Sequence, residues 1–557
     1  MGDPRPVADD AAEAPSVVEG SSAPAHGRRA RLAILLVAVA TVLLTYAYTL
    51  NVRIPLLDRP ASWTRHAEGA ARTLRHMRIW DEVGLLETRF MMRTTDVHPG
   101  DRYIRDVGYL PDDEGVYYYV SFPPLFPLLP FLLLKAVNAP LGILSLRIFA
   151  LGLHLVTAML LFMLTRRVLL SRGEAHASSA GAFAAAVMLV SPGPLWYFSN
   201  AYESAALETP LLIACTYLGV RLLTDELRPR WLVPAFAAAS FALAYTEWLG
   251  IMFAASVGVV ALLRRDRRSL LAFAVSAAAV AAALGLMTLQ YSSVAGFKAF
   301  VEAIRGKAEM RVTFGGAVHH SLTSWPSWSH LLKWVKQGYG PGLVALAALA
   351  ASWLVGMTST PGGFRRRLRA TFPRPLGVAL ALTALPAALH LLALFSHTVI
   401  HDFGLLKWAV PLGLLVGALA AELGSWGARS RNRLGALAAA ALVLAVAVHT
   451  VLPEAIKRDF TVTWGAVKVG TAIAQTGVDP DEPVFVEAPR KFYMGSSTVY
   501  YAGRNLARYK DAAGAAAIMK RSGATGAVLF RVNEDMEVER TERLGPDGHA
   551  IGSAQLE

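Results

Sequence analysis

The chain has 557 residues, of which 54% are hydrophobic and only 17% are charged, and its mean hydropathy is +0.41. Soluble globular proteins are about a quarter charged. Here the apolar residues are also gathered into long runs, so the composition excludes an ordinary soluble enzyme and predicts a polytopic membrane protein. The net charge of +13 would suggest nucleic acid in a soluble protein, but the arginine clusters lie between apolar runs, where membrane topology explains them without a nucleic-acid partner. The single cysteine, Cys215, excludes an intrachain disulfide.

Residues 1–27 are polar and include several prolines and acidic residues, which predicts a disordered cytosolic tail. The run Leu32–Leu50, which follows three arginines, is long enough to cross a bilayer. No small-x-small cleavage site follows it, so we interpret it as a retained first span and not as a signal peptide. Ten further apolar runs bring the predicted spans to eleven: Ile143–Thr165, Ser179–Phe198, Ala205–Leu223, Trp231–Thr246, Trp248–Leu263, Leu270–Gln290, Leu343–Met357, Leu376–Phe395, Leu405–Leu423 and Ala436–Leu452.

The segment 121–137 is apolar but short, and it contains four prolines. If it does not cross, and if Trp231–Leu263 is a hairpin of two spans, every arginine cluster between spans falls on the cytosolic side, as the positive-inside rule requires. If it does cross, every cluster moves outside. We therefore expect a re-entrant or interfacial helix at 121–137 and a cytosolic N-terminus. Four regions then lie outside: 51–142, 291–342, 397–404 and the residues after 453.

Residues 454–557 are predicted to form a small extracytoplasmic α/β domain. Helical stretches at 457–476 and 510–521 alternate with two strand-like runs, Pro483–Ala488 and Gly526–Val532. The predicted membrane domain is 28–453, within which 51–142 forms a first external loop with interfacial helices. No internal repeat is visible, which argues against a typical secondary transporter.

The first external loop offers the first candidate chemistry. Residues His66–Glu82 have a helix-forming composition with apolar residues for one face, which predicts an amphipathic helix on the membrane surface. Its polar residues are either solvated charges, or one of them, Glu68 or His66, acts as a general base. A base is needed because the hydroxyl of a sugar acceptor is a weak nucleophile.

An acidic run follows in the same loop and leads into Tyr117–Tyr119. It comprises Asp96, His98, Asp101, Asp106, Asp112, Asp113 and Glu114. Its oxygens suit a divalent metal ion such as Mg²⁺ or Ca²⁺, but the spacing is not that of an EF-hand, so a solvated loop is the favoured interpretation. Tyr119 is either an interfacial anchor or a surface on which a sugar stacks.

Ionisable residues at the external ends of spans form a further set. Three of them are carboxylates at the ends of adjacent predicted spans: Glu203, Glu208 and Glu247. Carboxylates at membrane depth are costly and usually face a cavity or a partner, so we expect Glu208 or Glu247 to line a cavity. The external region 291–342 has an excess of basic residues, among them Arg305 and Lys307. This excess suits either a phosphate ligand or anionic lipid headgroups.

The stretch SHTVIHDFGLLKWAVP places His401, Asp402 and Lys407 at the external mouth of the tenth predicted span. A His–Asp pair beside a lysine suits a phosphate or an acceptor group. His397 and His401 are four residues apart, but the stretch is predicted to be a loop without a third clear ligand, which disfavours zinc.

These features together resemble the GT-C superfamily of integral-membrane glycosyltransferases, which includes protein O-mannosyltransferases and lipid A aminoarabinose transferases. The acidic pair that the family carries after its first span is replaced here by His66 and Glu68, with Asp58 nearer the membrane. The matching pieces are, in chain order, His66-Ala67-Glu68, Ser121-Phe122-Pro123-Pro124-Leu125, Leu146-Arg147-Ile148-Phe149 through Arg166-Arg167, Phe198–Leu212 and His401–Pro411.

The resemblance implies a mainly α bundle of about 11 spans in the plasma (inner) membrane. It also implies transfer of a sugar from a polyprenyl-phosphate donor to a lipid, glycan or protein acceptor on the extracytoplasmic face. In this interpretation Glu68, His66 or Asp58 is the base, and Arg305, Lys307 and Lys407 are candidate phosphate ligands. The cavity is lined by Glu208, Glu247, His401, Asp402 and Tyr119.

Two other functions are compatible with many spans. A transporter or lipid flippase would explain the spans and the buried carboxylates, but not the large first external loop or the exported α/β domain. A polysaccharide polymerase is the other alternative. No G-x-G-x-x-G fingerprint occurs in a cytosolic segment, which fits a lipid-linked donor better than a nucleotide sugar.

Overall fold

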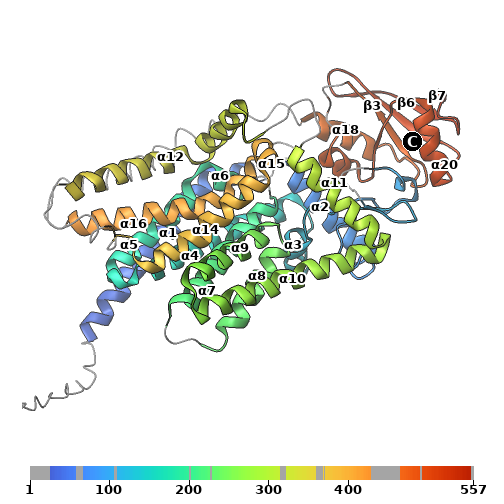
Figure 1. The fold of residues 1–557 in the computed structure, drawn as a ribbon. Helices are drawn as coiled ribbons and strands as arrows, with labels where there is room; N and C mark the ends of the chain where they lie inside the picture. Colours follow the sequence, from blue (N-terminus) through green and yellow to red (C-terminus); the bar gives the residue numbers. More distant parts are fainter. Residues whose placement is uncertain are drawn as a thin grey trace, which may run out of the picture.

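The computed structural model describes residues 25–57, 67–105, 110–199, 202–225, 229–313, 321–358, 368, 371–427, 464–489, 492 and 494–553. Within these residues a long helical body carries a smaller unit with a β-sheet at one end (Figure 1). The first external loop lies between the body and the sheet-containing unit, because α2 (Ala67–Val83) packs against both.

The helical body confirms the predicted membrane fold. In the described residues, seven helices are long and apolar enough to cross a membrane. They are α1 (Ala25–Arg53), α4 (Ile143–Leu169), α7 (Ser204–Thr224), α10 (Arg267–Ala295), α12 (Trp325–Thr358), α14 (Arg374–Ala393) and α16 (Ala409–Gly427) with the 3-10 segment η4 (Asp402–Trp408) before it. Three shorter apolar helices, α5 (Glu174–Val190), α8 (Leu232–Ala244) and α9 (Leu249–Arg264), lie at three other predicted spans. The eleventh predicted span, Ala436–Leu452, lies outside the described residues.

Helix boundaries differ from the prediction at several places. α1 begins at Ala25, inside the tail 1–27 that was predicted to be disordered. The predicted third span ends early at Val190, because Pro192 starts a separate short helix, α6 (Pro192–Tyr197). The predicted external loop 291–342 instead contains α11 (Phe297–Thr313) and the first half of α12. The span predicted at Leu343–Met357 is the second half of α12, which continues through Pro341.

The ambiguous proline-rich segment forms α3 (Leu125–Ala136). Its 12 residues extend about 18 Å at about 1.5 Å per residue, which is short of the roughly 30 Å hydrocarbon core. The helix is anchored at its start by protein contacts. Leu125 N–H donates to Tyr245 O over 3.1 Å, and Trp248 Nε1 donates to Ser121 O over 2.8 Å. These contacts place α3 against the turn between α8 and α9.

The arginine-rich helix ends gather at one end of the body. Arg167 pairs with Asp225, Arg264 donates to Leu223 O over 3.0 Å, and Arg172 pairs with Glu422 over 2.5 Å. These contacts join the ends of α4, α7, α9 and α16. The first external loop and the sheet-containing unit lie together at the other end of the body (Figure 1).

The C-terminal unit is a five-stranded sheet in the order β4-β3-β5-β6-β7. Its elements are α18 (Trp464–Ala474), β3 (Val484–Glu487), α19 (Ser496–Ala502), β4 (Ala507–Arg508), α20 (Ala512–Ser522), β5 (Ala527–Val532), β6 (Val538–Leu544) and β7 (Ala550–Ser553). β3 is parallel to β4 and β5, whereas β6 and β7 extend the sheet antiparallel. The two predicted strands are β3 and β5, which are apolar because both faces are buried. β6 was missed because its sequence, VERTERL, is mostly charged.

Candidate active site

The helix that carries the candidate base is not a surface helix. Ala70, Ala71, Leu74 and Arg75 of α2 are almost fully buried, because the helix is enclosed between the membrane body and α19. The prediction of an amphipathic helix on the membrane surface with solvated charges is therefore wrong for α2. Its charged residues are held by protein partners.

Glu68 lies in the first turn of α2 and is partly buried. Its Oε2 accepts a hydrogen bond of 3.1 Å from the main-chain N–H of Ser497 in α19. The other two candidate bases, His66 and Asp58, lie outside the described residues.

A second carboxylate reaches the same turn of α2. Glu203, at the start of α7, is 4% exposed, and its side chain lies directly against Gly69. A Cβ atom on residue 69 would lie 2.0 Å from Glu203 Oε1, so only glycine permits this contact. The sequence placed Glu203 outside the membrane but did not connect it with Glu68.

Tyr119 is held beside α2. Its hydroxyl accepts a 3.0 Å hydrogen bond from Arg72 Nη1, and the guanidinium lies 4.9 Å from the centre of the ring. With Tyr119 only 5% exposed, the ring is part of the packed protein and is not an exposed interfacial anchor. Arg72, one turn after Glu68 on α2, therefore packs against Tyr119.

Four ionisable residues form a buried chain at the start of α7, just before α9, near the end of α14 and in η4. Lys407 Nζ lies 3.0 Å from Glu208 Oε1 and 3.2 Å from His390 Nδ1, and His390 Nε2 lies 3.3 Å from Glu247. We call Glu208, Lys407, His390 and Glu247 the buried quartet. The structure thus brings together three of the predicted residues. His390 was not singled out, although an ionisable residue inside a predicted span is itself a signal of function.

His401 and Asp402 are close to Lys407 in the sequence but contact residues outside the buried quartet. Asp402 Oδ1 accepts a 2.6 Å hydrogen bond from the hydroxyl of Tyr197. The rings of His397 and His401 are 4.6 Å apart, and both lie against Phe403. His397 lies in a short helix, α15 (Phe395–Ile400), where the sequence predicted a loop.

The two basic residues of α11 are placed differently from Lys407. Arg305 is exposed and pairs with Glu309, one turn away, over 2.8 Å. Lys307 is on the same helix and is partly buried. The contact of α11 with α15 keeps this helix near His397 and His401. Arg305 pairs with Glu309 and Lys407 pairs with Glu208, so these two candidate phosphate ligands have separate protein partners.

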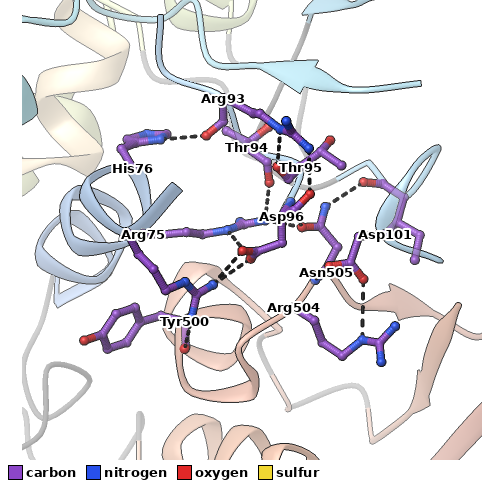
Figure 2. Close-up of polar contacts among 12 residues, drawn as sticks. Arg75, His76, Arg93, Thr94, Thr95, Asp96, Asp101, Tyr500, Arg504 and Asn505 are labelled. Atoms are coloured by element: carbon purple, nitrogen blue, oxygen red, sulfur yellow. Dashed lines mark hydrogen bonds and ion pairs between the residues drawn. The ribbon is translucent and has the colours of Figure 1, made fainter. Parts of the chain in front are cut away.

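The acidic run of the first loop is solvated only in part: Asp113 and Glu114 are exposed as predicted, Asp106 lies outside the described residues, and the prediction is wrong for Asp96 and Asp101. Asp96 and Asp101 are buried and face arginines of two separate elements (Figure 2). Asp96 accepts from Arg78 over 2.7 Å and from Arg75 over 3.3 Å, and Asp101 Oδ1 lies 3.4 Å from Arg504. The described residues contain no group of three or more His, Cys, Asp or Glu placed to hold a metal ion.

Burial in this cluster determines the protonation of two groups outside the membrane. Burial lowers the pKa of His76 to about 3, so the neutral ring donates from Nδ1 to Arg93 O over 2.9 Å. Burial raises the pKa of Asp101 to about 7, although Arg504 and the N–H of Asn505 oppose this shift. Asp101 therefore titrates near neutral pH at the contact between the first loop and the C-terminal unit.

This titration predicts a pH-dependent stability. The pKa of Asp101 is raised in the folded state. Between about pH 4 and pH 7, Asp101 is therefore protonated in the folded protein and ionised in the unfolded chain. The contribution of Asp101 to stability is then lost as pH rises through that window, by at most about 4 kcal/mol. We expect the unfolding temperature of Asp101→Asn to depend less on pH between 5 and 7.5 than that of the wild type. Identical pH profiles would contradict this assignment.

Comparison with known proteins gives a consistent fold. No protein-family model and no curated protein sequence matches the chain. Among solved structures, the chain is similar to the oligosaccharyltransferase AglB from Archaeoglobus fulgidus, with a TM-score of 0.55, 12% identity and coverage of 88% of this chain and 69% of that one. It is also similar to ArnT from Cupriavidus metallidurans, with a TM-score of 0.53, 16% identity and coverage of 90% and 93%. The chain therefore shares the fold of AglB and ArnT, a membrane-protein fold of the kind that the resemblance in its sequence predicted.

Proposed function

We propose that this protein transfers a glycosyl group from a polyprenyl-phosphate-linked sugar to an acceptor on the extracytoplasmic face of the membrane. The observation that carries the proposal is the GT-C fold, with a carboxylate, Glu68, at the start of the first-loop helix. The two similar proteins support the class of donor. The AglB structure contains a dolichol-phosphate and an inhibitory peptide, and the ArnT structure contains undecaprenyl phosphate.

In the proposed reaction Glu68 acts as the general base. It accepts the proton of the acceptor hydroxyl while that oxygen bonds to the anomeric carbon of the donor sugar. The bond from the anomeric carbon to the phosphate oxygen breaks, and polyprenyl phosphate leaves with the negative charge. Arg305, Lys307 and Lys407 are the proposed partners of that phosphate. His66 and Asp58 are the alternative bases.

The proposed orientation follows from charge. The arginine-rich helix ends that meet around Asp225 and Glu422 belong in the cytosol, together with the N-terminal tail 1–27. The membrane domain 28–453 then presents α2 and the buried quartet to the outside, and the α/β domain 454–557 is extracytoplasmic. The plasma membrane is the proposed location.

Transfer can be tested with the full chain in lipid nanodiscs and a synthetic polyprenyl-phosphate hexose. We expect release of polyprenyl phosphate that depends on an added acceptor fraction of envelope lipids, glycans or proteins, with the labelled sugar recovered on the acceptor. Glu68→Gln serves as the inactive control. If the protein instead moves the intact donor across vesicle membranes without cleaving it, the transporter alternative replaces this proposal.

A further inference from the structure

One face of α2 is bound to the C-terminal unit along most of its length. Glu68 accepts from the N–H of Ser497, Arg75 donates to the side chain of Asn505, and Arg78 Nη1 lies 3.5 Å from Tyr500 O. Positions 68, 75 and 78 are seven and three apart, a spacing that places them on a single face of a helix. The candidate base is therefore one of several groups on α2 that face the C-terminal domain.

Asn505 is the centre of this contact (Figure 2). Its Oδ1 accepts from Asp96 N–H over 3.0 Å and from Arg75, and its Nδ2 donates to Ile104 O over 3.0 Å. Its main-chain N–H donates to Asp101 over 2.9 Å. Asn505 is fully buried, and every polar group of its side chain has a partner in the first loop. We call Arg75, Asp96, Asp101, Arg504 and Asn505 the interdomain cluster.

The backbones of the two units also meet closely. Gly100 N–H donates to Pro480 O over 3.0 Å, and a Cβ atom on residue 100 would lie 2.6 Å from the backbone of Glu482. Such a contact leaves no room for sliding between the first loop and the C-terminal domain. Buried, fully satisfied polar groups of this kind fix one arrangement of the parts they join.

We propose that the C-terminal domain positions the catalytic base. The main-chain N–H of Ser497 fixes the Glu68 carboxylate, and the interdomain cluster holds that N–H in place. Ser497 and Asn505 are thus positioning residues, and this inference rests on the function proposed above. A glutamate at a helix start has several side-chain rotamers, and a hydrogen bond from a fixed main-chain N–H selects one of them. Misplacement of a reacting group by about 1 Å can cost about 10²-fold in rate, so this selection has a measurable effect.

The test is a double-mutant cycle between Asn505→Ala and Glu68→Asp, measured as turnover of a polyprenyl-phosphate hexose by the full chain. Asn505→Ala removes the centre of the interdomain cluster and is expected to lower kcat about 10- to 100-fold with the donor KM within about twofold of the wild type. Glu68→Asp keeps a carboxylate but shortens it, so it no longer reaches Ser497. In that background Asn505→Ala should have almost no further effect on kcat.

A matched control separates positioning from general loosening of the domain. Lys468→Ala breaks an ion pair within the C-terminal domain, with Glu537 over 3.2 Å, and should leave kcat unchanged. If Asn505→Ala does not yield folded protein, Arg78→Gln takes its place, because Arg78 bonds Tyr500 O and Asp96 from a partly exposed position.

The outcomes separate this inference from the proposed function. If the losses from Asn505→Ala and Glu68→Asp multiply fully, the cluster does not act through Glu68 and the inference is wrong. If Asn505→Ala lowers only the unfolding temperature, the cluster is structural and the inference is also wrong. A wild-type protein that turns over no polyprenyl-phosphate sugar would instead overturn the proposed function itself.

Discussion

Glu68→Gln is expected to lower turnover by about 10²- to 10⁴-fold while leaving the fold and donor binding intact. The fold should survive because the amide oxygen of glutamine still accepts the hydrogen bond that Ser497 N–H makes to Glu68 in α2. The lost property is the ability to accept a proton. Turnover and donor affinity are measured in parallel with a synthetic polyprenyl-phosphate hexose.

Three companion variants locate the base if it is not Glu68. His66→Ala and Asp58→Asn test the other two candidates of the first loop, and Glu203→Gln tests the carboxylate that lies against Gly69. Near wild-type turnover of Glu68→Gln, together with an inactive companion, reassigns the base to that residue. If all four variants remain active, the base is not in this part of the molecule.

Much of the fold could be predicted because it depends on local composition. An apolar run such as Ile143–Thr165 is long enough to cross a bilayer, and a helix occupies it whatever its neighbours are. The strands β3 and β5 were predicted for a similar reason, since a strand that is buried on both faces is apolar throughout. Two of the exceptions, α11 and β6, are elements in which charged residues interrupt the apolar pattern, as in FKAFVEAIRGKAEMRVT and VERTERL.

The site was predicted less well because its partners are far apart in the sequence. Asp96 and Asp101 resembled a solvated acidic loop, and nothing near them indicated a partner. Arg504 and Asn505, which make burial of Asp101 acceptable, lie some four hundred residues later. In contrast, Glu208 and Lys407 could be expected near one cavity, because each is a charged residue at the external end of a predicted span. Their direct ion pair required the structure.

Lys407→Met is expected to destabilise the protein strongly. The side chains of Lys407 and Glu208 are each 1% exposed, and their ion pair of 3.0 Å lies within the buried quartet. Removing one partner of a buried pair leaves the other charge without compensation, which typically costs about 3–5 kcal/mol. The expected result is a lower yield and unfolding temperature for Lys407→Met in detergent. The double variant Lys407→Met/Glu208→Gln removes both charges and should recover most of the loss.

The stable double variant then decides whether Lys407 also binds the donor. If Lys407 contacts the phosphate as proposed, the affinity for a polyprenyl-phosphate hexose should fall about 10- to 100-fold, since hydrogen bonds to charged groups contribute about 1.5–3 kcal/mol. Glu208→Gln alone is the matched control, because it keeps the lysine and its 3.2 Å contact with His390. Unchanged donor affinity in the double variant would limit Lys407 to a structural role inside the buried quartet. The phosphate would then be held by other cations, with Arg305 and Lys307 of α11 the next to be tested.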